Sequence, residues 1–196
     1  MQLAKQHCLS EAEYLAFEEA SPTRHEFVAG ELFALDGVSQ RHNRIAGNLA
    51  IALMTVFRDK PCQVFMSDVK LHVAQGSAYY YPDVMATCTE QAIAANESQL
   101  ASEPVLVVEV LSPSTETIDR REKLHAYRRL PSLQEYALIS QDMQQVEIYR
   151  RQGEGGDIGA WLFITYEPGD NVEFASIGLS LPIAELYAGT DVARMP

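Results

Sequence analysis

The segment PVLVVEVL, residues 104–111, constrains the fold of this chain more than any other stretch. Residues 105–108 form an uninterrupted apolar run, which is typical of a strand that is buried on both faces of a sheet. Glu109 interrupts that run before two further apolar residues resume it. An ionised carboxylate inside such a strand loses several kcal/mol of hydration unless a cation or hydrogen-bond donors replace the water. We therefore expect Glu109 to have a partner, although a strand end that emerges into solvent would explain it without one.

The length and composition of the chain are those of an ordinary globular protein. At 196 residues, with 47% hydrophobic and 21% charged residues, the chain suits one domain with a sizeable core, and we expect a single domain over residues 1–196. No run of eighteen or more apolar residues occurs, and the N-terminus has no basic segment followed by an apolar run. These features predict a cytoplasmic protein with neither a membrane span nor a signal peptide.

The cysteines and the net charge exclude some classes of site. Cys8, Cys62 and Cys88 are scattered and form neither a C-x-x-C pair nor a zinc-type spacing with the five histidines, so we expect reduced structural thiols. The formal net charge of −12 argues against indiscriminate attraction to nucleic acid, because such binding draws its affinity from neutralising phosphates. A local basic cleft or a metal-bridged phosphate is compatible with that charge.

The hydrophobic pattern predicts alternating helices and strands. Expected helices span residues 10–20, 40–57 and 118–130. Expected strands span residues 25–28, 31–35, 62–66, 70–74, 82–87, 105–111, 136–139, 145–150, 161–166 and 172–174. Ser10 and Glu13 have capping-box spacing at the start of the first helix. The order predicts an α/β (α+β) fold, with a central mixed β-sheet flanked by helices.

A second acidic residue, Asp83, follows Pro82 near the start of an expected strand. Proline lacks the N–H that a sheet ladder needs, so Pro82 belongs at the first residue of a strand or on an edge strand. Pro-Asp alone is a weak signal, because the same dipeptide begins many turns. Its value comes from its combination with Glu109 on a second strand and with a lysine that serves both carboxylates.

That lysine is predicted on a helix rather than on the strand of Glu109. Two residues after Glu109, on the same face of the strand, stands Leu111. At about 100° per residue, one face of the helix expected over residues 118–130 carries Asp119, Lys123, Tyr127 and Leu130. Lys123 is the one base beside this expected packing face. The alternative is a surface ion pair between Lys123 and Asp119, worth only about 0.3–0.5 kcal/mol.

These residues together resemble a known family, the Uma-two-type endonucleases of the PD-(D/E)xK restriction-endonuclease-like superfamily. The motifs that carry the resemblance are Pro82-Asp83, Glu109-Val110-Leu111-Ser112-Pro113-Ser114, Asp119, Lys123, Tyr127 and Gln134-Glu135-Tyr136. It extends to His25-Glu26, Gly30-Glu31 and His42, so that it covers roughly residues 10–150. Its most specific part is the motif that begins at Glu109, followed by the helical lysine.

The resemblance implies a restriction-endonuclease-like core in which Asp83 and Glu109 meet to hold a divalent metal, Mg²⁺ or Mn²⁺. The lysine of the superfamily usually stands two residues after the second acid, where this chain has Leu111. In the pattern of this family a lysine from the following helix replaces it, and Lys123 fits that place. If Lys123 does not reach the metal, the protein would bind a substrate without cutting it.

The chemistry of phosphodiester hydrolysis suits these residue types. The reaction needs an attacking hydroxide and a counter-charge for the transition state, and Mg²⁺ can supply both. Mg²⁺ prefers octahedral oxygen coordination at about 2.0–2.1 Å and keeps several waters, so Asp83, Glu109 and the backbone carbonyl of Val110 would leave positions for water and phosphate. Lys123 would orient the attacking water and stabilise the developing charge, whereas a role as base would require burial to lower its pKa.

Glu31 and His42 are additional candidates for the site. The resemblance makes Glu31 a further acid for the metal, and a solvated strand carboxylate explains it about as well. His42 opens the long helix on its inward face, where the helix dipole disfavours a charged imidazole. It would contact phosphate or a metal-bound water, or would simply pack at the helix start.

The sequence therefore predicts a metal-dependent endonuclease that hydrolyses nucleic acid, with DNA as the expected substrate. Asp83, Glu109 and Lys123 are the expected catalytic residues, and Asp83, Glu109 and Val110 are the expected metal ligands. A non-catalytic module of the same fold, which binds nucleic acid or protein, is the alternative that Leu111 motivates. A hydrolase of small phosphate esters is a weaker one. A homodimer is compatible with cutting both strands of a duplex, but the sequence shows no clear interface.

Overall fold

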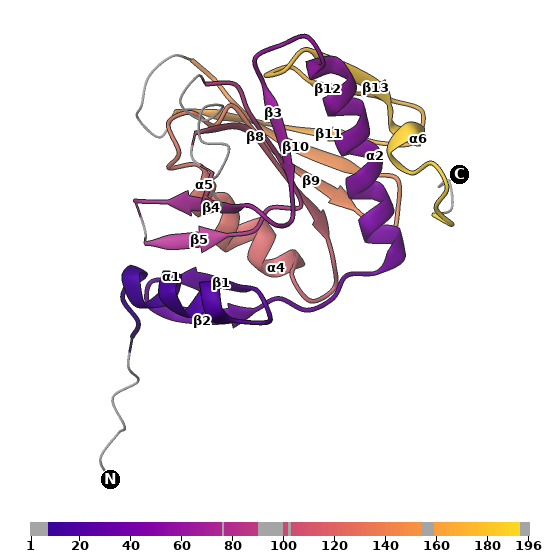
Figure 1. The fold of residues 1–196 in the computed structure, drawn as a ribbon. Helices are drawn as coiled ribbons and strands as arrows, with labels where there is room; N and C mark the ends of the chain where they lie inside the picture. Colours follow the sequence, from indigo (N-terminus) through magenta and orange to yellow (C-terminus); the bar gives the residue numbers. More distant parts are fainter. Residues whose placement is uncertain (1–7, 76, 90–99, 102, 154–158, 193–196) are drawn as a thin grey trace.

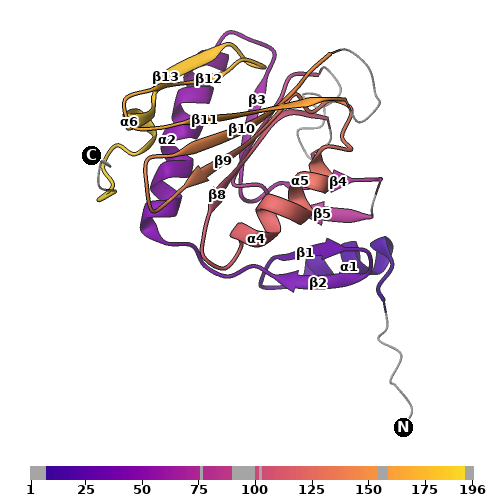
Figure 2. The same ribbon diagram turned by 180° about the vertical axis from the view of Figure 1, so that it is seen from behind.

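The computed structural model of the chain describes residues 8–75, 77–89, 100–101, 103–153 and 159–192, and Figures 1 and 2 show it from opposite sides. Within these residues the helices are α1 (Glu11–Ala20), α2 (Gln40–Phe57), α4 (Glu116–Ile118), the π-helix η1 (Asp119–Lys123), α5 (Leu124–Tyr127) and α6 (Ile183–Leu186). The strands are β1 (His25–Val28), β2 (Glu31–Ala34), β3 (Gln63–Met66), β4 (Lys70–Val73), β5 (Ala78–Tyr80), β6 (Val84–Thr87), β7 (Leu100–Ala101), β8 (Pro104–Leu111), β9 (Glu135–Ser140), β10 (Val146–Arg151), β11 (Trp161–Tyr166), β12 (Asn171–Phe174) and β13 (Leu179–Pro182).

A six-stranded mixed sheet, in the order β11-β10-β9-β8-β6-β3, forms the middle of the molecule (Figure 1). β8 is parallel to β9 and antiparallel to β6. Helix α2 packs on one face, where Leu49 and Val108 share a buried core. The segment from α4 to α5 packs on the other face, where Tyr127 and Val107 share a second core. Because side chains alternate along a strand, Glu109 points to the same face as Val107.

A smaller five-stranded sheet, in the order β2-β1-β5-β4-β7, lies next to the segment that runs from α4 to α5 (Figures 1 and 2). Helix α1 covers one of its faces, where Tyr14 stacks on Phe27 with ring centroids 4.9 Å apart. On the opposite face the Tyr80 ring lies 5.3 Å from the Tyr127 ring. The small sheet therefore presents one side to α1 and the other to the helix that carries Lys123.

The helix and strand predictions are confirmed for most of the chain. The helix predicted over residues 40–57 is observed with those bounds, and the predicted capping box at α1 is present, with the Ser10 N–H donating to Glu13 Oε2 over 2.8 Å. The helix predicted over residues 118–130 is instead observed from Glu116 to Tyr127 and contains a π-helical segment. Elements β5, β7, β13 and α6 were not expected from the pattern.

The prediction of three reduced thiols is wrong, because Cys62 and Cys88 form a disulfide with their Cα atoms 4.1 Å apart. β3 pairs antiparallel with β6, with Gln63 opposite Thr87, so the two cysteines lie opposite each other one position further along. The two cysteines are 26 residues apart, and this spacing alone does not indicate that their strands pair. Cys8 is a free, exposed cysteine.

Among the helices that the structure describes, none has the length and hydropathy that crossing a membrane requires.

Candidate active site

Asp83 and Glu109 are brought together by the pairing of β6 with β8. Val84 lies opposite Val108 in that antiparallel pair, which sets Asp83 next to Glu109 at the same end of the sheet. The Val110 N–H donates to Asp83 Oδ2 over 2.7 Å, and the Asp83 N–H lies 3.4 Å from Glu109 Oε2. Two carboxylates that are 26 residues apart in the sequence are therefore linked, one through the backbone of Val110 and the other through the backbone of Asp83.

Lys123 points into this cluster from the helix. Its Nζ lies 3.2 Å from Glu109 Oε1 and 2.9 Å from Glu26 Oε1. A third carboxylate oxygen, Asp119 Oδ1, lies 3.4 Å away, at ion-pair distance but without hydrogen-bond geometry. The Tyr127 hydroxyl donates to Glu109 Oε1 over 2.9 Å. The helix face predicted from the sequence is confirmed, because Asp119, Lys123 and Tyr127 are all buried.

The turn that carries Lys123 is a π-helix, in which the Leu124 N–H reaches back five residues to the Asp119 carbonyl. The Tyr136 hydroxyl donates to the same carbonyl over 3.0 Å. A wider turn changes the direction of the side chains relative to a regular α-helix, and such turns often occur at functional sites. The π turn therefore fixes how Asp119 and Lys123 face the sheet.

The buried cluster contains more carboxylates than cations. Burial alone would lower the pKa of Lys123, but the charges of Glu109, Glu26 and Asp119 outweigh that effect and raise it well above its ordinary value. Burial raises the pKa of Glu109 well above its ordinary range, and the Lys123 ammonium opposes this shift. Burial likewise raises the pKa of Asp119, again opposed by Lys123. One ammonium faces three carboxylates, with Asp83 beside them, so a further cation would stabilise their ionised forms.

His42 contacts Asp83. Its Nε2 lies 3.1 Å from Asp83 Oδ2, and its Nδ1 is buried with no hydrogen-bond partner among the described residues. The tautomer with the proton on Nε2 fits this arrangement, since that proton can be donated to Asp83. Ser39 caps the helix by accepting the His42 N–H over 3.0 Å, which holds the imidazole at the start of α2.

Glu31 and Leu111, which the sequence analysis also considered, lie outside the cluster of carboxylates around Lys123. Glu31 is exposed on the edge strand β2, opposite Val28, and no contact among the described residues joins it to Lys123 or the acids. Leu111, at the position where the superfamily usually has its lysine, is buried in the apolar core.

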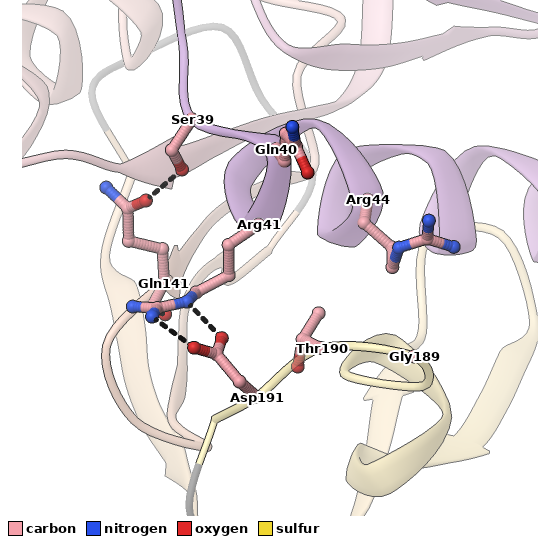
Figure 3. A pocket seen from close by; sticks show the side chains of 8 residues that line it. All are labelled: Ser39, Gln40, Arg41, Arg44, Gln141, Gly189, Thr190 and Asp191. Atoms are coloured by element: carbon pink, nitrogen blue, oxygen red, sulfur yellow. Dashed lines mark hydrogen bonds and ion pairs between the residues drawn. The ribbon is translucent and has the colours of Figure 1, made fainter.

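A hollow of about 490 Å³ lies beside the N-terminus of α2 (Figure 3). Arg41, Arg44, Gln141 and Asp191 are among its lining residues, whereas Asp83, Glu109 and Lys123 are not. Arg41 binds Asp191 through two hydrogen bonds of 2.8 and 3.0 Å. A surface ion pair therefore lines the hollow, and none of the expected catalytic residues does.

A family model described as "Uma2: Putative restriction endonuclease" matches residues 11–184. The chain belongs to the Uma2 family. Two proteins of Synechocystis sp. are similar over most of their length: "Uncharacterized protein slr1290" is 35% identical over 181 residues, covering 92% of both chains. "Uncharacterized protein sll1609" is 37% identical over 173 residues, covering 88% of this chain and 95% of its own. Membership in the Uma2 family supports a nuclease.

A solved structure shares the fold of this Uma2 chain. The crystal structure of a putative nuclease belonging to DUF820, from Anabaena variabilis, has a TM-score of 0.74 and covers 92% of this chain and 98% of its own. The two sequences are 19% identical, so the likeness is one of fold. The predicted restriction-endonuclease-like fold, α/β with a mixed sheet and helices on both faces, is confirmed.

The donor set of this Uma2 site fits a hard divalent cation. Asp83 Oδ1 has no hydrogen bond or ion pair among the described residues, and the Asp83 side chain is 17% exposed. In an extended strand the N–H and C=O of one residue point to the same side, so the Val110 carbonyl shares the side on which its N–H meets Asp83. No three His, Cys, Asp or Glu side chains in the described part of the chain are grouped to hold a metal. Mg²⁺ often has only one or two carboxylate ligands, together with waters and phosphate oxygens.

Sequence reasoning did not single out Glu26 as a site residue of this Uma2 chain. Glu26 is buried on β1, accepts the Tyr81 N–H over 3.3 Å and lies against Lys123. The sequence did contain a signal for this role, because Glu26 is a charged residue within an expected strand, directly before the apolar pair Phe27 and Val28. The same reasoning that was applied to Glu109 would have marked it.

Proposed function

We propose that this Uma2 protein is a divalent-metal-dependent endonuclease that hydrolyses phosphodiester bonds of nucleic acid, with DNA as its substrate. The observation that carries the proposal is that Asp83, just before β6, Glu109 on β8 and Lys123 on the helix lie together. The Val110 N–H donates to Asp83, and the Lys123 ammonium donates to Glu109. Family membership supports the nuclease activity. The metal and the substrate are part of the proposal.

Asp83 and Glu109, with the carbonyl of Val110, would hold Mg²⁺ or Mn²⁺. When bound, such an ion supplies Lewis-acid chemistry at the phosphate and activation of water. The excess of buried carboxylates over cations supports this assignment, since a second positive charge would balance them. His42 would position Asp83 by donating a hydrogen bond to it.

Lys123 would act as a cation rather than as a base. Its neighbouring carboxylates raise its pKa above the ordinary value, so its amine stays protonated at neutral pH. A protonated amine beside Glu109 can donate a hydrogen bond to a phosphate oxygen and stabilise the charge that develops there. Tyr127, which donates to Glu109 over 2.9 Å, would fix the orientation of that carboxylate.

The variant Glu109→Gln tests the proposal, because it keeps the size of the side chain and removes its charge. We expect Mg²⁺- or Mn²⁺-dependent cleavage of DNA to fall by about 100-fold or more. Glu185→Gln, at an exposed position on α6, is the matched control and should cleave like the wild type. Cleavage by Glu109→Gln at the wild-type rate would refute the assignment.

A non-catalytic module that binds nucleic acid or protein is the second candidate, and the buried Leu111 at the usual lysine position favours it. Isothermal titration calorimetry with Mg²⁺ or Mn²⁺ separates the two functions. Heat of binding that disappears in Asp83→Asn supports the nuclease, whereas absence of binding by the wild type supports the module. The nuclease proposal includes a homodimer only if the protein cuts both strands of a duplex, because two cuts are made most easily by two sites.

A further inference from the structure

Phe33 lies on the same face of the small sheet as the carboxylate cluster. β1 pairs antiparallel with β2, with Glu26 opposite Phe33, and residues opposite each other in such a pair have Cβ atoms about 4.5–5.5 Å apart on one face. The preceding residue, Leu32, points the other way and packs with Tyr14 and Phe27 under α1. Phe33 therefore faces the side of the sheet on which Lys123 lies.

Glu26, the cross-strand neighbour of Phe33, is connected through Lys123 to Glu109, a proposed metal ligand. Glu26 lies 2.9 Å from Lys123 Nζ, and that nitrogen lies 3.2 Å from Glu109. Glu26 is 7% exposed and Lys123 is 5% exposed, whereas Phe33 is 42% exposed. β2 is the outer strand of its sheet, and both views show α4 beside the β1–β2 hairpin (Figures 1 and 2). The two charged side chains are thus buried, whereas the Phe33 ring, opposite Glu26 on the outer strand, is open to solvent.

A substrate of this protein needs a source of affinity other than charge. The net charge of −12 opposes the approach of a polyanion, and Lys123 is already surrounded by three carboxylates. Stacking of a nucleobase on an aromatic ring does not depend on charge, and removal of one such ring weakens binding roughly 5- to 150-fold. An open phenylalanine beside the site has the chemistry for this contact.

We propose that Phe33 is a stacking platform for an unpaired nucleobase next to the phosphodiester bond that the site cleaves. The inference rests on the proposed nuclease function and names its substrate class. Bases inside a duplex already stack on both neighbours, so a protein ring can take only a base that is unpaired. The preferred substrate is therefore single-stranded nucleic acid or an unpaired end.

A different role for Phe33 would be to shield the Glu26–Lys123 ion pair from water. Leucine shields almost as well as phenylalanine but offers no ring to a base, whereas tryptophan keeps an aromatic ring on which a base can stack. Phe33→Leu and Phe33→Trp therefore separate stacking from shielding. Phe17 provides a matched control, because it is 43% exposed and lies on α1, which covers the opposite face of the same sheet.

The experiment measures fluorescence anisotropy of a labelled single-stranded oligonucleotide with each variant in the Glu109→Gln background, after circular dichroism has confirmed folding. We expect Phe33→Ala and Phe33→Leu each to weaken binding roughly 5- to 150-fold, and Phe33→Trp and Phe17→Ala to stay within about twofold. An abasic site scanned along the oligonucleotide should, at one position, abolish the difference in binding between the protein that retains Phe33 and the Phe33→Ala variant. A duplex of the same sequence should bind more weakly.

Binding by Phe33→Leu that equals that of the protein with Phe33 overturns stacking, and so does a Phe33→Ala penalty that no abasic position removes. Duplex binding as tight as single-strand binding overturns the proposed substrate class. Failure of the nuclease proposal has a different signature: the protein with intact Glu109 would neither cleave nor bind any of these nucleic acids, and the inference would fall with it. Cleavage that is unchanged by all Phe33 variants overturns this inference alone.

Discussion

Glu26 is the carboxylate through which the small sheet contacts the proposed catalytic lysine. Its carboxylate lies 2.9 Å from Lys123 Nζ and accepts the Tyr81 N–H. Glu26→Gln would keep the shape of the side chain and replace one of the three carboxylates that face the ammonium by a neutral amide. Because Glu26 contacts Lys123 rather than the substrate, we expect kcat to fall about 10- to 100-fold while KM stays nearly unchanged. Steady-state kinetics with a fluorogenic oligonucleotide would measure both.

The control for that variant is Glu18→Gln, because Glu18 is also 7% exposed. Glu18 accepts hydrogen bonds from the His25 N–H and the Tyr81 hydroxyl, away from Lys123. A loss of kcat that is equal in both variants would show that a buried glutamate in or next to the small sheet matters for folding alone. A loss confined to Glu26→Gln would support a positioning role.

The pairing of β3 with β6 is covalently closed by the Cys62–Cys88 disulfide, which spans 26 residues. A closed loop of this length lowers the entropy of the unfolded chain, and the chain-entropy model gives a stabilisation of about 3.5 kcal/mol. We expect a reducing agent to lower the free energy of unfolding by about that amount in urea denaturation. Cys8→Ser should behave like the wild type. A Cys62→Ala and Cys88→Ala double variant that still responds to the reductant would contradict this explanation.

The spacing of apolar residues predicted the long helices and strands, but it could not predict which segments far apart in the sequence pair with each other. Helix α2 has its core residues at helical spacing, so its bounds could be predicted from the sequence. The three-residue strand β5 is buried throughout and shows no alternation, and the π turn at Lys123 has no compositional signature. In the site, the apolar run around Glu109 predicted a buried carboxylate and the family resemblance pointed to Lys123, whereas the contact of Glu26 with Lys123 depends on the packing of a second sheet.

The whole molecule carries a net charge of −12, and its site concentrates further negative charge where water is excluded. A divalent ion that binds the folded site stabilises the native state by RT ln(1 + [L]/Kd), about 2.7 kcal/mol at a concentration 100 times Kd. For a chain of this size that corresponds to a rise in Tm of roughly 5–10 °C. We therefore expect Mg²⁺ or Mn²⁺ to raise the Tm of protein that was first treated with EDTA.

General screening of an acidic chain would also raise Tm, so sodium chloride at equal ionic strength is the necessary comparison. Specific binding predicts a larger shift with the divalent ion than with sodium, and loss of that difference in Asp83→Asn, since Asp83 offers the one carboxylate oxygen of the pair that has no partner among the described residues. Differential scanning fluorimetry would measure both effects. Equal shifts in the wild type and Asp83→Asn would assign the stabilisation to screening and would remove Asp83 from the proposed metal site.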